Sequence, residues 1–365
     1  MAGRLRAEHG VICRLPGERF GYFGWPSIAR LDDGTLIVAS SGLRTQHICP
    51  WGKTVLHHST DDGQTWSPSV VLNNSPLDDR DAGVISLGGQ RRLVSWFTSD
   101  TRQYVEGCKS WLGEDEVAGW EETLATWSDA LVKRWLGSWI RVSDDGATWG
   151  PPIRVPLSTP HGPIRLADGR LLYLGKASAH MDKGKIQAAV SKNDGGPWRV
   201  IGSVPLGPGV KPVNCHEPHV VELPSGKLVG LIRVEALAKE VPDRGLLNFS
   251  LFQTDSADGG RTWTRARPTG VYGSPPHLLR HSSGTLVCVY GYRKKPFGQR
   301  AMLSRDGGRT WAADWIIRAD GPDGDLGYPA SVELPGGEVL TIYYQKYAAG
   351  EKCSLLWSRW RLPKR

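Results

Sequence analysis

The chain has 365 residues and a formal net charge of +8, from 45 lysines and arginines against 37 aspartates and glutamates. Hydrophobic residues make up 39% and charged residues 22% of the sequence, which provides enough apolar surface for a core and excludes wholesale disorder. Because no run reaches about 18 apolar residues and the N-terminus has no apolar signal-peptide core, we expect a cytoplasmic protein with no membrane span.

The distribution of charged residues and cysteines limits the kinds of partner and binding site that we expect. Basic residues alternate with acidic ones and form no stripe, so we expect neither a nucleic-acid nor a membrane partner. The six cysteines form no CxxC pair, which favours buried thiols over a zinc or redox site. No set of His, Cys, Asp or Glu has metal-ligand spacing, so no cofactor is expected, while a structural calcium ion and a homo-oligomer stay open.

The first repeated pattern is an apolar, β-rich run that ends in a glycine turn and continues into a second apolar segment. Each copy is typical of a β-hairpin. The six copies span residues 26–36, 81–93, 161–171, 218–228, 276–286 and 329–340.

The second pattern, S-x-D-x-G-x-T-W or a close variant, recurs five times between these runs. An Asx side chain that bonds nearby backbone, followed by a glycine free to adopt positive φ, defines a tight turn, and the tryptophan anchors it. We therefore predict that the Asx residues of these boxes are structural and not catalytic. They are Asp61, Asp144, Asn193, Asp258 and Asp306.

Alternation of runs and boxes gives about four strands per unit, which predicts an all-β, six-bladed β-propeller of four-stranded antiparallel blades. We expect residues 1–365 to form a single domain. The last unit has no clear box, and its strands at 341–347 and 353–362 are expected to pair with the N-terminal segment 9–15. That pairing would close the ring and remove the free sheet edges.

The second unit is longer because residues 99–138 intervene before its box. Apolar residues at three- and four-residue spacing predict one amphipathic helix there. We expect this helix to pack against the side of the propeller, with a cover over the central mouth and a dimer contact as alternatives. The apolar residues are Trp120, Leu124, Trp127, Leu131 and Trp135.

Aligning the six runs on their turn glycines places equivalent residues at the same height near the axis. The alignment gathers ionisable and aromatic side chains, and such a convergence predicts a substrate pocket. Taken singly, each histidine of this set is more simply a structural hydrogen-bonding residue, whereas Glu217 and Tyr328 favour a functional role. The full set is Trp25, Arg80, Asp81, His161, Glu217, His219, His277 and Tyr328.

These boxes and runs resemble the sialidase (neuraminidase) superfamily of six-bladed propellers, over almost the whole chain. The resemblance implies a Tyr nucleophile activated by a Glu, and it matches Tyr328 in DLGYPASVEL and Glu217 in CHEPHVVEL to this pair. A phenol with a pKa near 10 needs such a neighbouring base. The resemblance also implies that Arg233 and Arg300 bind a substrate carboxylate, for which guanidinium forks are suited.

Two positions depart from the family pattern. Gly24 stands where the resemblance implies a first carboxylate-binding arginine. In SSGLRTQHICPWGK, an ungapped alignment places His47 where the family has an acid/base aspartate. Histidine can serve as acid or base near neutral pH.

The sequence favours a sialidase-like exo-glycosidase acting on a terminal acidic sugar, with Tyr328 and Glu217 as the nucleophile pair and His47 as acid/base. The first alternative is a uronate glycan lyase or rhamnosidase-type propeller enzyme that uses His47. In the lyase, Tyr328 or His47 would abstract the proton beside the uronate carboxylate. The second alternative is a propeller that binds glycans without catalysis.

Overall fold

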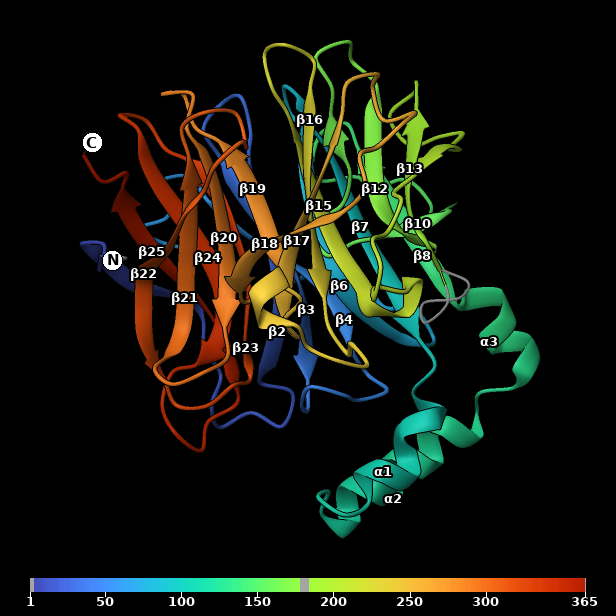
Figure 1. Ribbon diagram of the computed structural model, residues 1–365. Helices are drawn as coiled ribbons and strands as arrows, with labels where there is room; N and C mark the ends of the chain where they lie inside the picture. The colour runs from blue at the N-terminus through green and yellow to red at the C-terminus, as the bar shows by residue number, and fades with distance from the viewer. Residues whose placement is uncertain (1–2, 178–183, 365) are drawn as a thin grey trace.

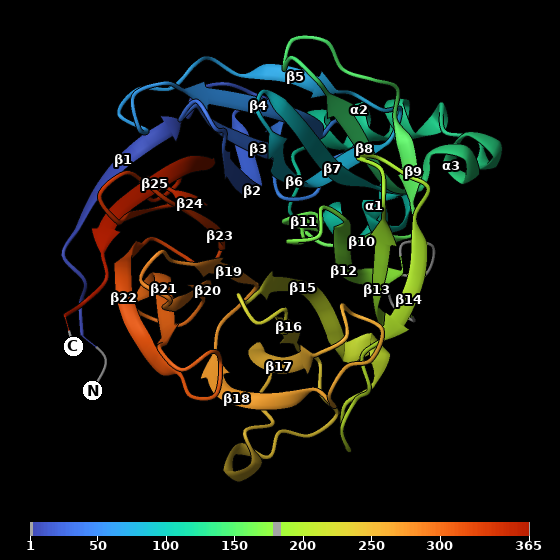
Figure 2. The ribbon, with the colours of Figure 1, turned by 90° about the horizontal axis from the view of Figure 1, so that it is seen from above.

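The computed structural model describes residues 3–177 and 184–364, which form six antiparallel sheets arranged as blades around a central axis (Figure 2). The predicted six-bladed β-propeller is confirmed. The first blade contains β2 (Tyr22–Arg30), β3 (Leu36–Arg44), β4 (Lys53–Ser59) and β5 (Val70–Asn73). The second contains β6 (Asp78–Gly88), β7 (Arg91–Ser99), β8 (Gly137–Ser143) and β9 (Ile153–Val155).

In the third blade the innermost strand is split in two, so that this sheet has five short strands. Its strands are β10 (Leu157–Ser158), β11 (Ile164–Arg165), β12 (Leu171–Ala177), β13 (Ile186–Ser191) and β14 (Arg199–Ser203). Both β10 and β11 pair with β12, and the interruption between them contains Pro160 and Pro163. Proline has no N–H to donate to a ladder, which accounts for the break.

The fourth and fifth blades are regular four-stranded sheets. The fourth contains β15 (Cys215–Glu222), β16 (Leu228–Val234), β17 (Ser250–Ser256) and β18 (Arg267–Tyr272). The fifth contains β19 (Pro276–Arg280), β20 (Leu286–Tyr292), β21 (Phe297–Ser304) and β22 (Ala312–Gly321). Apolar side chains of neighbouring blades pack together between the sheets, as Leu172 and Leu174 of the third blade do with Leu228 and Ile232 of the fourth.

The sixth blade joins the two ends of the chain. It contains β23 (Leu326–Glu333), β24 (Glu338–Lys346), β25 (Cys353–Arg361) and, from the N-terminus, β1 (Ala7–Cys13). Strand β1 runs antiparallel to β25, with Ala7 opposite Trp360 and Val11 opposite Leu356. The predicted closure of the ring by the N-terminal segment is therefore confirmed.

The aspartic boxes form turns stabilised by their own side chains. Asp61 accepts hydrogen bonds from Thr65 N at 2.9 Å and from the Thr65 hydroxyl at 2.6 Å, and Ser59 Oγ accepts from Gly63 N at 2.9 Å. Asp258 and Asp306 make the same contacts in their boxes. Hydrogen bonds from the threonine lower the pKa of Asp61 to about 2, so the carboxylate is engaged in the turn.

Two boxes differ from the prediction. In the second box Asp145, and not Asp144, accepts from the backbone N–H groups of Ala147 at 2.8 Å and Thr148 at 2.7 Å. The serine of this box, Ser143, stands one residue closer to the tryptophan, so the turn is one residue shorter. In the third box, the backbone carbonyl of Asn193 accepts the turn hydrogen bonds.

The insertion in the second blade contains two main helices instead of the single predicted helix. After the 3-10 turn Thr101–Tyr104 and the short α1 (Val105–Cys108) come α2 (Glu114–Ala125) and α3 (Asp129–Trp135). Ser128 Oγ accepts a hydrogen bond from Leu131 N at 3.2 Å, which caps α3 and separates it from α2. The prediction of one helix was wrong because the apolar spacing continues through this cap.

The helical insertion extends beyond one end of the propeller (Figure 1). Its apolar residues Trp120 and Trp127 are buried together with Cys49 and Leu77, which belong to loops flanking the outer strands of the first blade. The helices therefore pack mainly on these loops and not on the faces of the sheets. No helix in residues 3–177 or 184–364 is long and apolar enough to cross a membrane.

Candidate active site

Four innermost strands share a backbone irregularity at their entry to the axis. Trp25, Asp81, Glu217 and Tyr328 have φ values of 51°, 47°, 47° and 49°, and each lies within a register shift of its strand pair. Residues other than glycine rarely adopt this left-handed conformation, and such strained residues concentrate at functional sites. We call these four residues the mouth ring.

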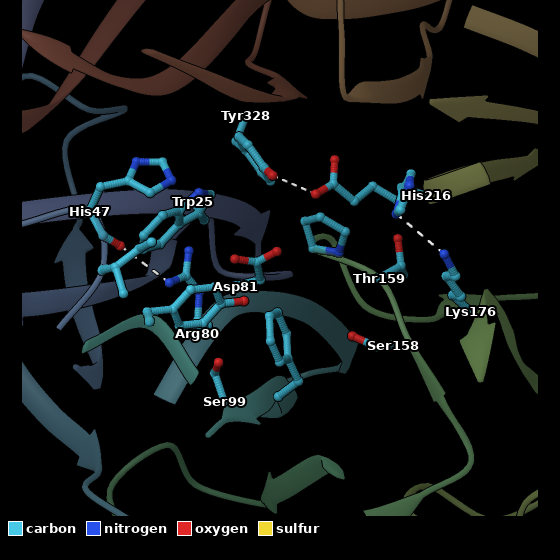
Figure 3. A pocket seen from close by; sticks show the side chains of 15 residues that line it. Trp25, His47, Arg80, Asp81, Ser99, Ser158, Thr159, Lys176, His216 and Tyr328 are labelled. Atoms are coloured by element: carbon cyan, nitrogen blue, oxygen red, sulfur yellow. Dashed lines mark hydrogen bonds between the residues drawn. The ribbon is translucent and has the colours of Figure 1, made fainter. Parts of the chain in front are cut away.

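The mouth ring lines a single cavity of about 320 Å³, together with His47 and Arg80 (Figure 3). The sequence alignment paired Arg80 with Trp25 and Glu217, but the structure makes Asp81 the equivalent residue. The cause is the β6–β7 hairpin, where Gly88 pairs with Arg91 and the turn glycine falls one residue earlier than in the other blades. Both Arg80 and Asp81 nevertheless face the cavity.

Tyr328 and Glu217 meet in the cavity although they are 111 residues apart in the chain. The Tyr328 hydroxyl donates to Glu217 Oε1 at 2.5 Å. Arg233 Nη1, at the end of β16, donates to Glu217 Oε2 at 2.6 Å and to the Tyr328 oxygen at 3.2 Å. The structure thus brings together the pair that the resemblance assigned to nucleophile and base.

The charges around this pair fix its resting protonation state. Burial opposes ionisation of Glu217, but the Arg233 guanidinium and the hydrogen bonds hold the pKa of Glu217 below its ordinary value. Burial and the adjacent Glu217 carboxylate raise the pKa of Tyr328 well above its ordinary value. Glu217 is therefore an anion and Tyr328 a neutral phenol, with the proton placed for transfer between them.

His47 reaches the same cavity from the loop after β3, and its side chain is 43% exposed. Its Nδ1 lies 2.9 Å from Asp325 Oδ1 and 3.0 Å from the Tyr22 hydroxyl, which itself donates to Asp325. Burial opposes the charge of Asp325, but the hydrogen bond from His47 holds its pKa below the ordinary value. The ionised Asp325 can only accept, so His47 carries its proton on Nδ1 and keeps Nε2 as a base.

Buried residues hold the loop that carries His47. Arg44 forms a two-pronged ion pair with Asp78, at 2.6 and 2.9 Å, and both side chains are fully buried. Arg44 Nη2 and Arg80 Nη1 also donate to the backbone carbonyl of His47, at 3.1 and 3.2 Å. Desolvation lowers the pKa of His47 despite the neighbouring Asp325, which favours the neutral imidazole.

The two predicted carboxylate-binding arginines lie in different places. Arg233 contacts the Tyr328–Glu217 pair, but its Nε and Nη2 are bonded to Glu235 Oε2 at 3.2 and 2.7 Å. Arg300 lies on β21, the third strand of its blade, where it pairs with Asp314 at 3.3 Å and stacks on the Tyr292 ring. Arg300 is not among the described residues that line the cavity.

The three predicted histidines do not line the cavity either, among the described residues. His161, His219 and His277 are buried around the axis with ring centroids 4.4–5.3 Å apart, and we call them the axial histidines. His219 Nδ1 accepts from Leu278 N at 2.8 Å and His277 Nδ1 from Ser331 N at 3.3 Å. Desolvation lowers the pKa of His219 to about 3, so the His219 imidazole is neutral, and its hydrogen bond to Leu278 N gives it a structural role.

Several polar residues of the site were not found from the sequence. Asp325 holds His47, Arg293 follows β20 and donates to the Leu326 carbonyl, and Lys176 lies 3.4 Å from His216 Nδ1 at the cavity wall. The sequence signal for Asp325 is its place three residues before Tyr328. No group of three or more potential metal ligands occurs in the part of the chain that the structure describes.

The six-bladed propeller with its aspartic boxes has the sialidase-like fold. The chain belongs to the BNR repeat-like domain family, whose model matches residues 116–341. No curated protein matches the sequence.

Solved structures with the same fold include a protein of unknown function from Dyadobacter fermentans. It is 23% identical, with a TM-score of 0.76 and 98% of each chain covered. Trypanosoma rangeli sialidase in complex with sialic acid is 15% identical, with a TM-score of 0.67, over 98% of this chain and 60% of that chain. The Hadza microbial sialidase Hz136 is 18% identical, with a TM-score of 0.66, over 97% and 68%. The chain thus spans about 60% of the trypanosomal enzyme.

Proposed function

We propose that this protein is a retaining glycoside hydrolase that cleaves a terminal sugar in the cavity of the mouth ring. The observation that carries the proposal is the 2.5 Å hydrogen bond between Tyr328 and the ionised Glu217 at the wall of a cavity that His47 also reaches. A propeller that only held a glycan would have no need of a buried carboxylate base on a phenol.

In the first step Glu217 takes the proton of the Tyr328 hydroxyl while the phenolate oxygen attacks the anomeric carbon. The glycosidic bond breaks, and the leaving oxygen takes a proton from His47, which reacts in its protonated form, the minor form at neutral pH because burial lowers its pKa. In the second step the neutral His47 removes a proton from water, the water oxygen attacks the anomeric carbon, and the Tyr328 oxygen leaves and regains its proton from Glu217. Asp325 stabilises the positive charge that His47 carries before the first step and after the second.

The terminal acidic sugar expected from the sequence requires free arginines at the reacting carbon. That expectation relied on Arg233 and Arg300, and the structure bonds Arg233 to two glutamates and places Arg300 outside the cavity lining.

The proposal is tested with a panel of aryl glycosides that includes α-sialosides, uronosides and neutral aldosides. We expect release of the phenol from at least one of them, with loss of that activity in Tyr328→Phe. Tyr347→Phe, which alters an exposed tyrosine stacked on Arg14, is the matched control. Glycan binding that survives Glu217→Gln and Tyr328→Phe, with no turnover by the unaltered protein, would favour the non-catalytic alternative.

A uronate lyase is the second candidate, because His47 is a neutral base oriented by Asp325. In that reaction the base takes the proton beside the uronate carboxylate, the glycosidic bond breaks, and the departing oxygen receives the proton from the base, leaving a C=C bond in the sugar and consuming no water. Mass spectrometry in ¹⁸O-labelled water separates the two reactions. Hydrolysis introduces one labelled oxygen into the released sugar, and elimination gives an unsaturated sugar with none.

A further inference from the structure

The guanidinium groups beside the nucleophile are engaged with other groups of the same chain. Glu235 Oε2 accepts from both Nε and Nη2 of Arg233, which is the edge that would otherwise bind a carboxylate of a ligand. The remaining nitrogen, Nη1, is bonded to Glu217. Arg293 turns its Nε and Nη2 to the Leu326 carbonyl, at 3.1 and 3.0 Å.

Phe249 lies against both of these arginines. Its ring centroid is 5.0 Å from the Arg233 guanidinium carbon and 4.9 Å from that of Arg293. The loop that carries Phe249 is fixed by its own hydrogen bonds, from Leu237 N to Asn248 Oδ1 at 2.7 Å and from Asn248 N to Glu240 Oε1 at 2.6 Å. The loop between β16 and β17 therefore supplies both a carboxylate and a ring to cover the cationic edge.

Two carboxyl groups lie near the reacting oxygen, beside Arg233 Nη1, which donates to that oxygen at 3.2 Å. Glu217 contacts Tyr328 directly, and Asp81 lines the same cavity with Oδ1 bonded to no described group. The cations among the described lining residues contact other groups, since Arg80 stacks on Trp25 at 4.2 Å and Lys176 lies beside His216. A carboxylate on the reacting carbon would meet these acidic groups, and the Arg233 nitrogen nearest to it is already bonded to Glu217.

An arginine introduced at position 24, where the resemblance implies one, would not fit unless the Tyr22 ring moved. A Cβ atom on Gly24 would lie 3.3 Å from the Tyr22 ring, and Tyr22 is the residue that bonds both Asp325 and His47. The absence of a side chain at Gly24 thus leaves room for the Tyr22 ring, which in turn bonds Asp325 and His47.

We propose that the sugar whose anomeric carbon meets Tyr328 is an aldose residue, with hydrogen and not a carboxylate on that carbon, and that Glu235 and Phe249 exclude 2-keto-acid sugars. This inference rests on the proposed glycosidase function and assigns its substrate class. The unpartnered Asp81 oxygen is then available to a sugar hydroxyl.

The test compares kcat/KM for 4-nitrophenyl aldosides with that for 4-nitrophenyl α-sialoside. We expect the best aldoside to exceed the sialoside by about 100-fold or more, because the sialoside leaves its charge unpaired. A sialoside turned over as well as the best aldoside would overturn the inference and leave the glycosidase proposal standing. Turnover of neither class would instead count against the glycosidase proposal.

Calorimetry with N-acetylneuraminic acid gives a second readout that does not need turnover. We expect no binding to the unaltered protein and measurable binding to Glu235→Ala, in which the Nε and Nη2 edge of Arg233 is released. Glu338→Ala, which removes a glutamate paired with Arg361, is the matched control and should not bind. Binding by the unaltered protein, or a folded Glu235→Ala that binds no better, would contradict the role given to Glu235. If Glu235→Ala does not fold, the unaltered protein still decides.

Discussion

The mouth ring and the axial histidines both lie near the propeller axis, and strand β15 contributes a residue to each, but their environments are opposite. Glu217 belongs to the mouth ring and His219, two residues further along β15, belongs to the axial histidines. Glu217 faces a cavity and keeps its charge next to Arg233, whereas His219 is enclosed by two other imidazoles and loses its charge. Two positions on one strand, only two residues apart, thus differ in role: Glu217 belongs to the candidate active site and His219 to the packed core.

The backbone explains why the two groups separate. Residues i and i+2 of a regular strand point to the same face, but a bulge with a left-handed residue redirects the side chain. The register shift between His216 and His219 contains Glu217. If this account is correct, substitutions in the mouth ring should reduce catalysis with little loss of stability, and substitutions of the axial histidines should do the reverse.

The largest effect is expected for Tyr328→Phe. Removing the proposed nucleophile should lower kcat/KM on the order of 10³-fold or more, as found for other covalent catalysts. The ring keeps its packing against Trp25 and Tyr344, so the melting temperature should change little. Steady-state kinetics and thermal denaturation on one sample check both statements. A variant that loses stability and activity in parallel would place Tyr328 in the core and not in the reaction.

The next effect is expected for His47→Asn. Loss of an acid/base group should lower kcat about 10²- to 10⁴-fold on a substrate with a poor leaving group. On an activated aryl glycoside, whose leaving oxygen needs no proton, the loss in the first step should be much smaller. Asp325→Asn should show the same leaving-group dependence with a smaller loss, because it misorients His47 without removing it. An equal loss on both substrates would contradict the acid role of His47.

An intermediate effect, on stability alone, is expected for His277→Ala. The substitution removes a buried ring stacked 4.4 Å from His219 and should lower the free energy of unfolding by about 2 kcal/mol or more. The kcat/KM of the folded fraction should stay within a few-fold of the original. Chemical denaturation provides the free energy. Unchanged stability with reduced kcat/KM would assign His277 to the site after all.

The sequence revealed the fold because the structure repeats. Five boxes and six hairpin runs mark the period of the blades. The last unit has no clear box, and this predicted that the N-terminal segment would pair with its strands. It also placed Trp25, Glu217 and Tyr328 correctly at the mouth, since the three share one offset from their turn glycines. Because the blades repeat, the position of a residue within its unit predicts where it lies around the axis.

The remaining features of the site have no repeated equivalent. Asp325 and Arg293 come from loops that differ between blades, so no alignment of units reveals that one holds His47 and the other bonds the Leu326 carbonyl. The positions of the bulges cannot be predicted from the sequence either, because residue types do not show which residue adopts positive φ. For that reason the axial histidines were assigned to the pocket, whereas the early turn glycine of the β6–β7 hairpin aligned Arg80, in place of Asp81, with Trp25, Glu217 and Tyr328.

A further effect on stability alone is expected in its pH dependence. His161, His219 and His277 have folded-state pKa values lowered by burial, to about 3 for His219, against about 6.5 when unfolded. Below about pH 6.5 the unfolded chain binds protons that the folded chain does not, so these groups make stability fall as the pH falls.

Other buried groups act in the opposite direction. The pKa of Asp79 is raised to about 7 by burial, so this carboxyl makes stability fall as the pH rises toward 7. Comparison with His219→Asn isolates the histidine contribution, because the amide oxygen can still accept from Leu278 N. Between pH 6.5 and 4 the variant should lose less stability, by about 1.4 kcal/mol per pH unit for one proton. Parallel curves would show that His219 does not titrate on unfolding.

The smallest effect concerns the second box. Asp145→Ala removes the acceptor for Ala147 N and Thr148 N and should lower the melting temperature measurably. Asp144→Ala, the substitution suggested by the sequence pattern, should change it less because Asp144 contacts only the exposed Arg91 among the described residues. Differential scanning calorimetry of the two variants decides between them, and the reverse order would contradict the shorter turn.

The most direct test of the account is covalent trapping followed by peptide mass spectrometry. The protein is incubated with activated fluorosugars, both 2-deoxy-2-fluoro-aldosyl fluorides and a 2,3-difluoro sialic acid, and then digested. The account predicts a fluoroglycosyl adduct on Tyr328 that comes from an aldosyl reagent and is absent after Glu217→Gln. An adduct on another residue, or none on Tyr328 in a protein that hydrolyses the corresponding glycoside, would contradict it.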